Sequence, residues 1–454
     1  MTITNPATEK VVKEITADTP TIIKEKYEKL KIGQKEWQKV SLEKRIACIV
    51  KFGELVKENI DELALLLTTE MGKPISQAYG EIKGAHGRID FFSQHAHQWL
   101  SEEWLVKEGG TKEKLAFEPL GVIANISAWN YPYNVGYNVF LAALICGNAV
   151  LYKPSEYTAL TGLKFRELLW KAGIPENVFE CVLGTADAGK ILLELPLNGY
   201  FFTGSYNTGK SIAQAVAHKL VPVQLELGGK DPLYVADDVV DVTKVAASAA
   251  EGAFYNTGQS CCAVERIYVH ENIYDQFVEE FLKEVKSYKM GDPTQKDVFI
   301  GPLTRFQQID VLNDQVKDAV SKGAKIVLGG KKAEMKGYYY EPTVLVNVNH
   351  TMSVMHDESF GPIIGIQKVK NDEEALALMQ DTEYGLTAAV YSSNYDRAQN
   401  LMEKLDSGTV YWNCCDRVSV NLPWSGRKHS GLGSTLSYLG IRAFVKPKAY
   451  HLRG

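Results

Sequence analysis

Residues 200–211 read YFFTGSYNTGKS, and this stretch decides the fold. Its apolar start is typical of a short buried strand, and glycines follow before a helix that we expect over residues 211–218. Glycine lets a backbone approach a phosphate closely, and a helix N-terminus offers free N–H groups. The stretch therefore predicts a strand, a glycine-rich turn and a helix that together can bind a phosphate group.

Strands and helices alternate on both sides of this stretch. The predicted strands are residues 122–126, 149–152, 178–183, 200–202, 265–269 and 325–328. The predicted helices are residues 164–172, 211–218, 239–254, 274–287 and 307–322. Alternation at this spacing is typical of an α/β fold with a mostly parallel, doubly wound sheet.

Three segments depart from this alternation. Apolar residues recur at helical spacing within residues 21–100, so we expect helices there. Residues 105–117 hold two adjacent glycines between polar–apolar runs, which predicts a β-hairpin. Residues 443–452 are expected to be extended and to pair with another element or another chain.

Length and composition narrow the class of protein. The chain has 454 residues, which predicts two or three domains, and its net charge of −5 argues against a nucleic-acid partner. Residues 1–11 lack an apolar run, and the longest apolar stretch, residues 139–150, is too short to cross a bilayer. We therefore expect a soluble, cytoplasmic protein with no membrane partner.

The cysteine pattern excludes further classes. Seven cysteines, an odd number, do not indicate a secreted disulfide framework, and no C-x-x-C spacing occurs, so we expect no metal site. The H-E-x-x-H motif of metalloproteases and the G-x-S-x-G motif of hydrolases are also absent. Cys414 and Cys415 could be redox-sensitive, although two ordinary, partly buried thiols are the simpler interpretation.

Residues 204–211 also match the phosphate-loop pattern of nucleoside triphosphatases, G-x-x-x-x-G-K followed by Ser or Thr. A triphosphatase is therefore an alternative function. Because no other segment supports it, we interpret the match as a coincidence.

Two segments supply reactive groups. Residues 255–263, YNTGQSCCA, place a thiol in a turn of small residues, and residues 225–230, LELGGK, place a carboxylate among leucines and glycines. A thiol nucleophile and a separate carboxylate base are what oxidation of an aldehyde through a covalent thioester requires. The apolar neighbours of Glu226 are expected to desolvate its carboxylate and to raise its pKa toward neutrality.

Further motifs accompany these two segments. They are NPAT at 5–8, ANISAWNYPY at 124–133, LYKPSE at 151–156, HDESFGP at 356–362, DTEYGLTAAV at 381–390, PWSGRKHSG at 423–431 and GIRAF at 440–444. In order and spacing the whole set resembles the NAD(P)-dependent aldehyde dehydrogenase superfamily, over essentially the whole chain. Four positions depart from the residues usual in that family: Tyr131, Asp381, Trp424 and Ser425.

The resemblance implies oxidation of an aldehyde to the carboxylic acid with NAD(P)+, and three catalytic residues. Cys261 is the nucleophile, because the family's thiol stands two residues after the position of Gln259, and Cys262 is its neighbour. The side-chain amide of Asn130 donates to the developing oxyanion. Glu226 is the base that activates the water which hydrolyses the thioester.

The resemblance also implies the residues that hold the cofactor. They are Trp129, Lys153, Glu156, Gly204, Ser205, Gly209, Glu358 and Phe360. In the family the residues matching Lys153 and Glu156 hold the adenosine ribose, and the one matching Glu358 holds the nicotinamide ribose. A carboxylate accepts hydrogen bonds from a 2′-hydroxyl and repels a 2′-phosphate, so Glu156 predicts a preference for NAD over NADP.

Three structural parts follow from the same resemblance. We expect a Rossmann-like cofactor-binding domain in residues 1–100 and 119–226, and an α/β catalytic domain in residues 227–431. A small β element for oligomerisation combines residues 101–118 with residues 432–454. That element would otherwise leave strand edges exposed, which predicts a homodimer or homotetramer.

The sequence leaves the aldehyde open. Three arginines could anchor the carboxylate of a semialdehyde such as succinate semialdehyde: Arg417, Arg427 and Arg442. Aromatic side chains would instead favour an apolar or aromatic aldehyde: Tyr131, Tyr133, Tyr137 and Trp424, of which we place Tyr131 and Trp424 in the substrate tunnel. An acylating enzyme that passes the acyl group to coenzyme A is an alternative that Glu226 disfavours, and a non-catalytic binding protein on the same scaffold is another.

Overall fold

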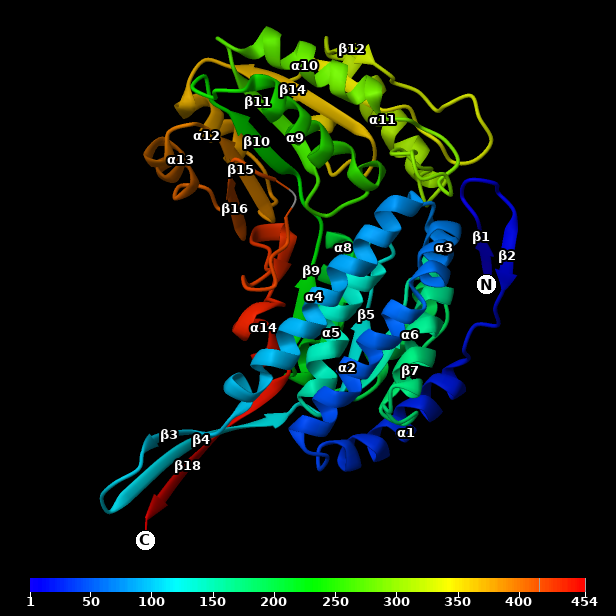
Figure 1. The fold of residues 1–454 in the computed structure, drawn as a ribbon, viewed down its shortest axis with the longest axis vertical. Coiled ribbons are helices and arrows are strands. Elements are labelled where there is room, and N and C mark those ends of the chain that lie inside the picture. The colour runs from blue at the N-terminus through cyan, green and yellow to red at the C-terminus, as the bar shows by residue number, and fades with distance from the viewer. Residues whose placement is uncertain (416, 454) are drawn as a thin grey trace.

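Two predominantly parallel sheets form the body of the molecule, one above the other in Figure 1. The computed structural model describes residues 1–415 and 417–453. The first sheet has six strands in the order β17-β9-β8-β5-β6-β7. These strands are β5 (Val122–Ile126), β6 (Ala149–Lys153), β7 (Phe179–Cys181), β8 (Tyr200–Thr203), β9 (Val223–Glu226) and β17 (Gly431–Leu432), of which only β17 runs antiparallel.

Eight helices surround or precede the first sheet. They are α1 (Pro20–Trp37), α2 (Leu42–Glu58), α3 (Ile60–Met71), α4 (Ile75–Leu100), α5 (Pro132–Ile145), α6 (Ala159–Lys171), α7 (Ala186–Glu194) and α8 (Tyr206–Val216). The strands β5 and β6 are apolar along nearly their whole length, because helices on both faces bury them. The helices predicted within residues 21–100 are thus confirmed.

The second sheet has seven strands in the order β12-β13-β14-β11-β10-β15-β16. They are β10 (Asp231–Val235), β11 (Val264–His270), β12 (Lys325–Leu328), β13 (Thr343–Val346), β14 (Ile363–Val369), β15 (Thr387–Tyr391) and β16 (Thr409–Trp412), with β12 antiparallel at one edge. Its helices are α9 (Val242–Phe254), α10 (Tyr274–Ser287), α11 (Gln307–Ser321), α12 (Asp372–Gln380) and α13 (Tyr395–Met402).

Alternation along β10 shows why this sheet is covered on both faces. Leu233 and Val235 pack with α9 and α10, whereas Tyr234 packs with α11, α12 and α13 on the other face. Successive strand residues point to opposite faces, so an apolar strand needs a helical layer on each side. The predicted α/β architecture with mostly parallel, doubly wound sheets is confirmed.

The helix that follows β8 begins earlier than the sequence predicts. We predicted a helix over residues 211–218 after a glycine-rich turn, but α8 begins at Tyr206, so only Gly204 and Ser205 separate strand from helix. Gly209 lies inside α8, where an added Cβ would stand 2.5 Å from the Leu227 side chain. This glycine therefore allows close helix packing and does not belong to a loop, and the phosphate-loop alternative was wrong.

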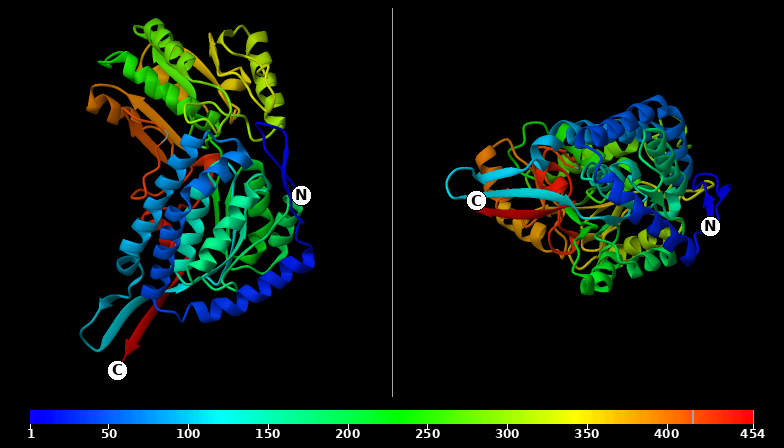
Figure 2. Two further views of the ribbon diagram at one scale, coloured as in Figure 1. Left: turned by 45° about the vertical axis from the view of Figure 1, so that its right-hand side comes forward. Right: turned by 90° about the horizontal axis from the view of Figure 1, so that it is seen from below.

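A three-stranded antiparallel arm projects from the body next to the six-stranded sheet (Figures 1 and 2). It consists of β3 (Glu103–Val106), β4 (Thr111–Pro119) and β18 (Val445–Arg453), and β18 pairs with β4 from Val445 to Arg453. The predicted hairpin and extended tail are thus two parts of one sheet. The short helix α14 (Ser437–Arg442) leads into β18.

A hairpin at the N-terminus was not predicted. Its strands are β1 (Thr2–Thr4) and β2 (Val11–Glu14), and all four residues of β2 are exposed. An exposed, partly charged strand lacks the apolar alternation by which strands are recognised.

No helix in the described part of the chain combines the length and apolarity that a bilayer span demands.

The two sheets meet end to end. Residues 227–230 alone separate the end of β9 from the start of β10. Because the strands around them are parallel, the carboxyl edge of the six-stranded sheet faces the amino edge of the seven-stranded sheet. Loops from both edges meet at this junction.

Candidate active site

A cavity of about 380 Å³ lies at the junction of the two sheets. Five predicted site residues line it, namely Asn130, Tyr131, Glu226, Cys261 and Trp424. They come from the loop after β5, from the end of β9, from the loop before β11 and from the segment before β17. The fold therefore brings together residues that are up to 294 positions apart, from Asn130 to Trp424 (424 − 130 = 294).

A strained, buried loop presents Cys261 to the cavity. Asn256 and Thr257 have φ angles of 54° and 58°, a left-handed conformation that is costly for a β-branched residue. Hydrogen bonds hold this conformation: the Asn256 N–H donates to Gln77 Oε1 at 2.9 Å, and the Gly301 N–H donates to Thr257 Oγ1 at 3.0 Å. Because these hydrogen bonds fix the backbone of the loop, the Cys261 thiol has a defined position.

The surroundings of Cys261 favour the protonated thiol over the thiolate. A hydrogen bond with the Cys262 thiol, and then burial, raise the pKa of Cys261 well above its usual value. Nucleophilic attack requires the thiolate. The site must therefore provide a group that accepts this proton.

Glu226 is the carboxyl group suited to that task. It ends β9, is 7% exposed, and burial raises its pKa to about 7, while the positive charge of Arg88 opposes the rise. Its Oε1 accepts hydrogen bonds from the Thr435 hydroxyl and, at 3.3 Å, from Gln224 Nε2. The expected rise toward neutrality is confirmed, and a carboxyl group with such a pKa can exchange protons near neutral pH.

The side-chain amide of Asn130 links the loop after β5 to the loop that carries Cys261. Its Nδ2 donates to the Gln259 carbonyl at 3.3 Å, and its own carbonyl accepts from Lys73 Nζ at 2.8 Å and from Asn256 Nδ2 at 3.3 Å. An amide nitrogen carries two hydrogens, so one N–H of Asn130 is left for a group inside the cavity. Asn130 is 4% exposed, and a donor in so dry a position stabilises a developing charge effectively.

A buried ion pair, which the sequence analysis missed, fixes this loop. Lys73 and Glu81 are both fully buried and form a salt bridge, and Glu81 Oε1 accepts from the Tyr133 N–H at 2.9 Å. Lys73 Nζ also lies 3.7 Å from the centre of the Tyr131 ring. Nothing in the sequence around residues 71–74 indicates that this lysine is buried.

A second cavity, of about 620 Å³, opens at the carboxyl ends of β5, β6 and β8. The order of the strands reverses between β5 and β8, and doubly wound sheets bind dinucleotides at such a point. Trp129, Lys153, Glu156 and Gly204 line this cavity as predicted. Lys153 Nζ is 4.0 Å from Glu156 Oε2, and an added Cβ at Gly204 would stand 2.4 Å from the Phe202 ring.

The remaining predicted cofactor residues are not among those that line this cavity: Ser205, Gly209, Glu358 and Phe360. The Ser205 hydroxyl is 3.1 Å from that of Thr208, which does line the wall, and Gly209 is buried under Leu227. Phe360 packs edge-on against Trp129, with 5.4 Å between the ring centres. Glu358 Oε1 accepts from the Gly229 N–H at 3.1 Å, at the link between the two sheets. A polar rim, an apolar wall and a helix N-terminus suit a dinucleotide such as NAD(P).

Two of the three arginines considered as substrate anchors are engaged elsewhere. Arg427 pairs with Asp406 at 3.1 Å, and Arg442 pairs with Glu103 beside the projecting arm. Arg417 does line the 380 Å³ cavity, together with Val418, and its Nη2 is 4.0 Å from Glu251 Oε2. The arginine that lies buried in this cavity is Arg88, which the sequence analysis did not single out.

Comparison with known proteins agrees with this geometry. The sequence model described as "Aldehyde dehydrogenase family" matches residues 1–450. A succinate-semialdehyde dehydrogenase (NADP+) of Deinococcus radiodurans is 35% identical over 98% of this chain and 93% of its own, and a betaine aldehyde dehydrogenase of Rhizobium etli is 31% identical over 98% and 92%. The crystal structure of an E. coli NADP-dependent enzyme superposes with a TM-score of 0.97 at 30% identity, covering 100% of this chain and 94% of that one.

Proposed function

Since the chain belongs to the aldehyde dehydrogenase family and is an NAD(P)-dependent aldehyde dehydrogenase, we propose that Cys261, Glu226 and Asn130 carry out its reaction. One observation carries this assignment. A thiol, a carboxyl group with a pKa of about 7 and a buried amide donor all face one cavity, which adjoins a site suited to a dinucleotide.

The first step forms a bond between Cys261 Sγ and the aldehyde carbon. Glu226 shares the cavity, and its pKa of about 7 makes the carboxylate form available near neutral pH. It accepts the thiol proton, directly or through a water molecule, as the C–S bond forms. The carbonyl oxygen becomes an oxyanion, which accepts hydrogen bonds from the Asn130 amide and from the Cys261 N–H. One such donor lowers the barrier by about 3–4 kcal/mol.

The second half of the reaction releases the acid. The chemistry that NAD(P) supplies when bound is acceptance of the hydride from the aldehyde carbon, which leaves a thioester on Cys261. Glu226 releases the thiol proton to solvent, then takes a proton from water, and the hydroxide adds to the thioester carbonyl. The C–S bond breaks, the sulfur recovers a proton, and a carboxylic acid leaves.

For the cofactor we propose NAD in preference to NADP. Lys153 and Glu156 lie beside each other on the wall of the second cavity, where they would bind ribose hydroxyls, and the Glu156 carboxylate would repel a 2′-phosphate. Trp129, Phe360 and Glu358 would position the nicotinamide half, while Gly204, Ser205 and Gly209 shape the entrance of α8. Arg305 brings a cationic side chain to the same cavity, so NADP belongs in the test.

We also propose a homodimer or homotetramer, formed through residues 101–118 and 432–454, in the cytoplasm. Leu105, at the outer strand of the projecting arm, is 67% exposed, and β3 pairs only with β4 among the described strands. An apolar strand edge of this kind favours pairing with another chain. We further propose that residues 1–100 with 119–226 form the cofactor domain and that residues 227–431 form the catalytic domain. Light scattering of the intact protein and of a Leu105→Arg variant tests the assembly, and a monomeric intact protein would contradict it.

The experiment for the reaction measures initial rates of NADH or NADPH formation without coenzyme A, across aliphatic, aromatic and carboxylate-bearing aldehydes, and identifies the product. We expect the free acid, and higher kcat/KM with NAD than with NADP. Appearance of acyl-coenzyme A on addition of coenzyme A, with no acid in its absence, would favour the acylating alternative. Unchanged oxidation by a Cys261→Ala variant would refute the catalytic assignment.

A further inference from the structure

Arg88 is a buried arginine whose hydrogen-bonding groups are only partly used. It lies in α4, is 5% exposed and lines the 380 Å³ cavity together with Cys261 and Glu226. Its Nε donates to Asn138 Oδ1 at 2.6 Å, and among the described residues neither terminal nitrogen of the guanidinium has a hydrogen-bond partner. A guanidinium carries five N–H donors, so four of them remain for a ligand in the cavity.

The other charged groups on the cavity wall are balanced. Glu81 forms an ion pair with Lys73, and Glu251 lies 4.0 Å from Arg417. Glu226 has a pKa of about 7 and alternates between neutral and charged forms near neutral pH. Among the described residues, the cavity wall thus holds a buried positive charge, that of Arg88, with no ion-pair partner. A buried charge is costly unless something pairs with it.

The structure also leaves room in front of Arg88. Gly80 and Gly84 precede it at intervals of four residues, so all three positions lie along one face of α4, and all three line the cavity. An added Cβ at Gly84 would meet no atom within 4 Å. Two missing side chains on this face open the space into which the guanidinium can receive a ligand.

We propose that Arg88 binds a carboxylate at the end of the substrate remote from the aldehyde, so that the enzyme acts on short ω-carboxy aldehydes, that is, semialdehydes. This inference rests on the proposed function, because it assumes that Cys261 attacks an aldehyde in this cavity. Asn138 occupies Nε and orients the planar guanidinium, which leaves the two terminal nitrogens to bind both oxygens of one carboxylate. Arg88 is thereby a specificity-determining residue.

Burial distinguishes Arg88 from the other arginine of this cavity. The Arg417 side chain is 63% exposed, and it lies beside the Glu251 carboxylate. An exposed arginine contributes little net binding energy, whereas a desolvated one discriminates strongly against a substrate that lacks the matching group. The two residues therefore form a matched pair for testing.

The first test uses the wild-type enzyme. 4-Oxobutanoate is compared with 4-methylpentanal, in which an isopropyl group replaces the carboxylate at equal size, and NAD(P)H formation gives kcat/KM for each. We expect 4-oxobutanoate to be preferred by about 100-fold or more. Turnover of both aldehydes with equal kcat/KM overturns the role of Arg88 and leaves the proposed function intact. No turnover of any aldehyde overturns the proposed function and, with it, this inference.

The second test uses Arg88→Met, Arg88→Lys and Arg417→Met. The preference ratio should fall about 100-fold in Arg88→Met, mainly through a higher KM for 4-oxobutanoate, and by less in Arg88→Lys, which keeps the charge but loses the fork. The ratio is the informative quantity, because Arg88 also lowers the pKa of Glu226 and its loss would slow every substrate. A collapse of the ratio in Arg417→Met but not in Arg88→Met would overturn the proposal.

A third measurement does not depend on the folding of any variant. Succinate should inhibit the wild-type enzyme competitively against 4-oxobutanoate, and it should bind about 10-fold or more tightly than its neutral diamide, succinamide. Equal inhibition constants for the two compounds would contradict a carboxylate site in this cavity.

Discussion

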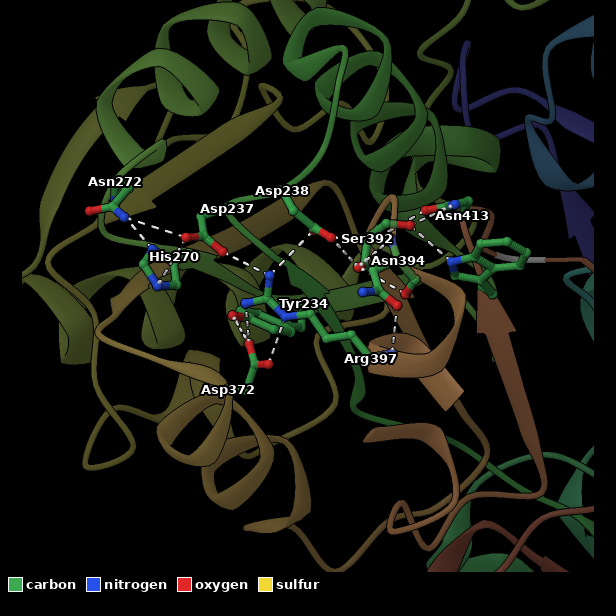
Figure 3. A network of polar contacts seen from close by, with 11 residues as sticks. Tyr234, Asp237, Asp238, His270, Asn272, Asp372, Ser392, Asn394, Arg397 and Asn413 are labelled. Carbon is green, nitrogen blue, oxygen red and sulfur yellow. Dashed lines mark hydrogen bonds and ion pairs between the residues drawn. The ribbon is translucent and has the colours of Figure 1, made fainter. Parts of the chain in front are cut away.

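The two parallel sheets share a topology but end differently at their carboxyl edges. At the edge of the six-stranded sheet, where strand order reverses between β5 and β8, a cavity of about 620 Å³ opens. At the corresponding edge of the seven-stranded sheet, the order reverses between β10 and β15. There, polar side chains form hydrogen bonds and ion pairs with one another (Figure 3). Such edges are where ligands bind in doubly wound folds, so one sheet uses the position and the other fills it.

Arg397 is the centre of the closed edge. Its Nε and Nη2 each lie 2.7 Å from a different oxygen of Asp372, and its Nη1 lies 2.8 Å from Asp237 and 3.4 Å from Asp238 (Figure 3). The Tyr234 hydroxyl donates to Asp372 at 2.7 Å. These carboxylates raise the pKa of Arg397 and keep it charged. Few N–H donors of its guanidinium remain for a ligand.

The open edge has no such mutual satisfaction. Lys153 is 5% exposed, and its nearest carboxylate oxygen, on Glu156, is 4.0 Å away. Arg88 in the neighbouring cavity likewise keeps free donors. The difference shows that topology provides a ligand-binding position, and that the pairing of its side chains decides whether the position is used.

The largest effect that follows from this comparison concerns Cys261, at the junction beyond the open edge. Replacement of Cys261 by Ala should lower kcat for NAD(P)H formation by on the order of 10⁴-fold or more, because no other group forms the covalent intermediate. Steady-state rates measure this, with Cys48→Ala in α2 as the control, whose activity should resemble that of the wild type. Comparable losses in both variants would indicate a general effect on folding.

The closed edge predicts a loss of stability and not of binding. Arg397→Met leaves three carboxylates together without their cation, and we expect the free energy of unfolding to fall by about 2–4 kcal/mol. Chemical denaturation measures this change. NAD(P) affinity, measured by calorimetry, should stay within about twofold because the edge takes no ligand.

Lys153→Met provides the matched change at the open edge. It removes a buried cation with a distant partner, so stability should hardly fall, while NAD(P) affinity should fall about 10-fold. If Arg397→Met weakens cofactor binding and Lys153→Met does not, the assignment of the cofactor to the edge of the six-stranded sheet is contradicted.

The sequence predicted this arrangement unevenly. Cys261, Glu226 and Asn130, which line one cavity, stand out in the sequence because each lies in a short contiguous motif. The helix α10 and the strand β12 have the predicted bounds because apolar periodicity marks them. The start of α8 was misplaced because its glycine serves packing against Leu227. Local patterns give such elements correctly only where tertiary contacts do not override them.

Pairing between distant residues could not be predicted. Asn138 orients Arg88 from 50 positions away, and Asp237 meets Arg397 from 160 positions away. Whether an arginine is saturated by carboxylates or keeps its donors for a ligand depends on those partners. From the sequence alone, three other arginines were therefore candidates for substrate anchors, and Arg88 was missed.

A further prediction concerns pH at the junction. Burial raises the pKa of Glu226 to about 7, and only the carboxylate can take a proton from water. Steady-state turnover should therefore rise by about 10-fold for each pH unit below about 7 and level off above it. A profile measured for Glu226→Gln should lack this limb, and an identical limb in that variant would assign it to another group.

The smallest expected effect sharpens the choice of cofactor at the open edge. Glu156→Gln removes the carboxylate but keeps a hydrogen-bonding side chain of the same size. The ratio of kcat/KM for NAD over that for NADP should fall about 10-fold. A wild-type enzyme that already prefers NADP would contradict the assigned role of Glu156.

The covalent intermediate on Cys261 is the central claim, and one measurement tests it most directly. Glu226→Gln is mixed with NAD and 4-oxobutanoate or a neutral aldehyde, quenched in acid and examined by mass spectrometry, while NADH is followed by absorbance. We predict a first phase of about one NADH per site, slower than in the wild type because the variant lacks the acceptor of the thiol proton. Still slower turnover should follow, with an acyl adduct at Cys261. An adduct on Cys262, or steady NADH formation with no burst and no adduct, would contradict the account.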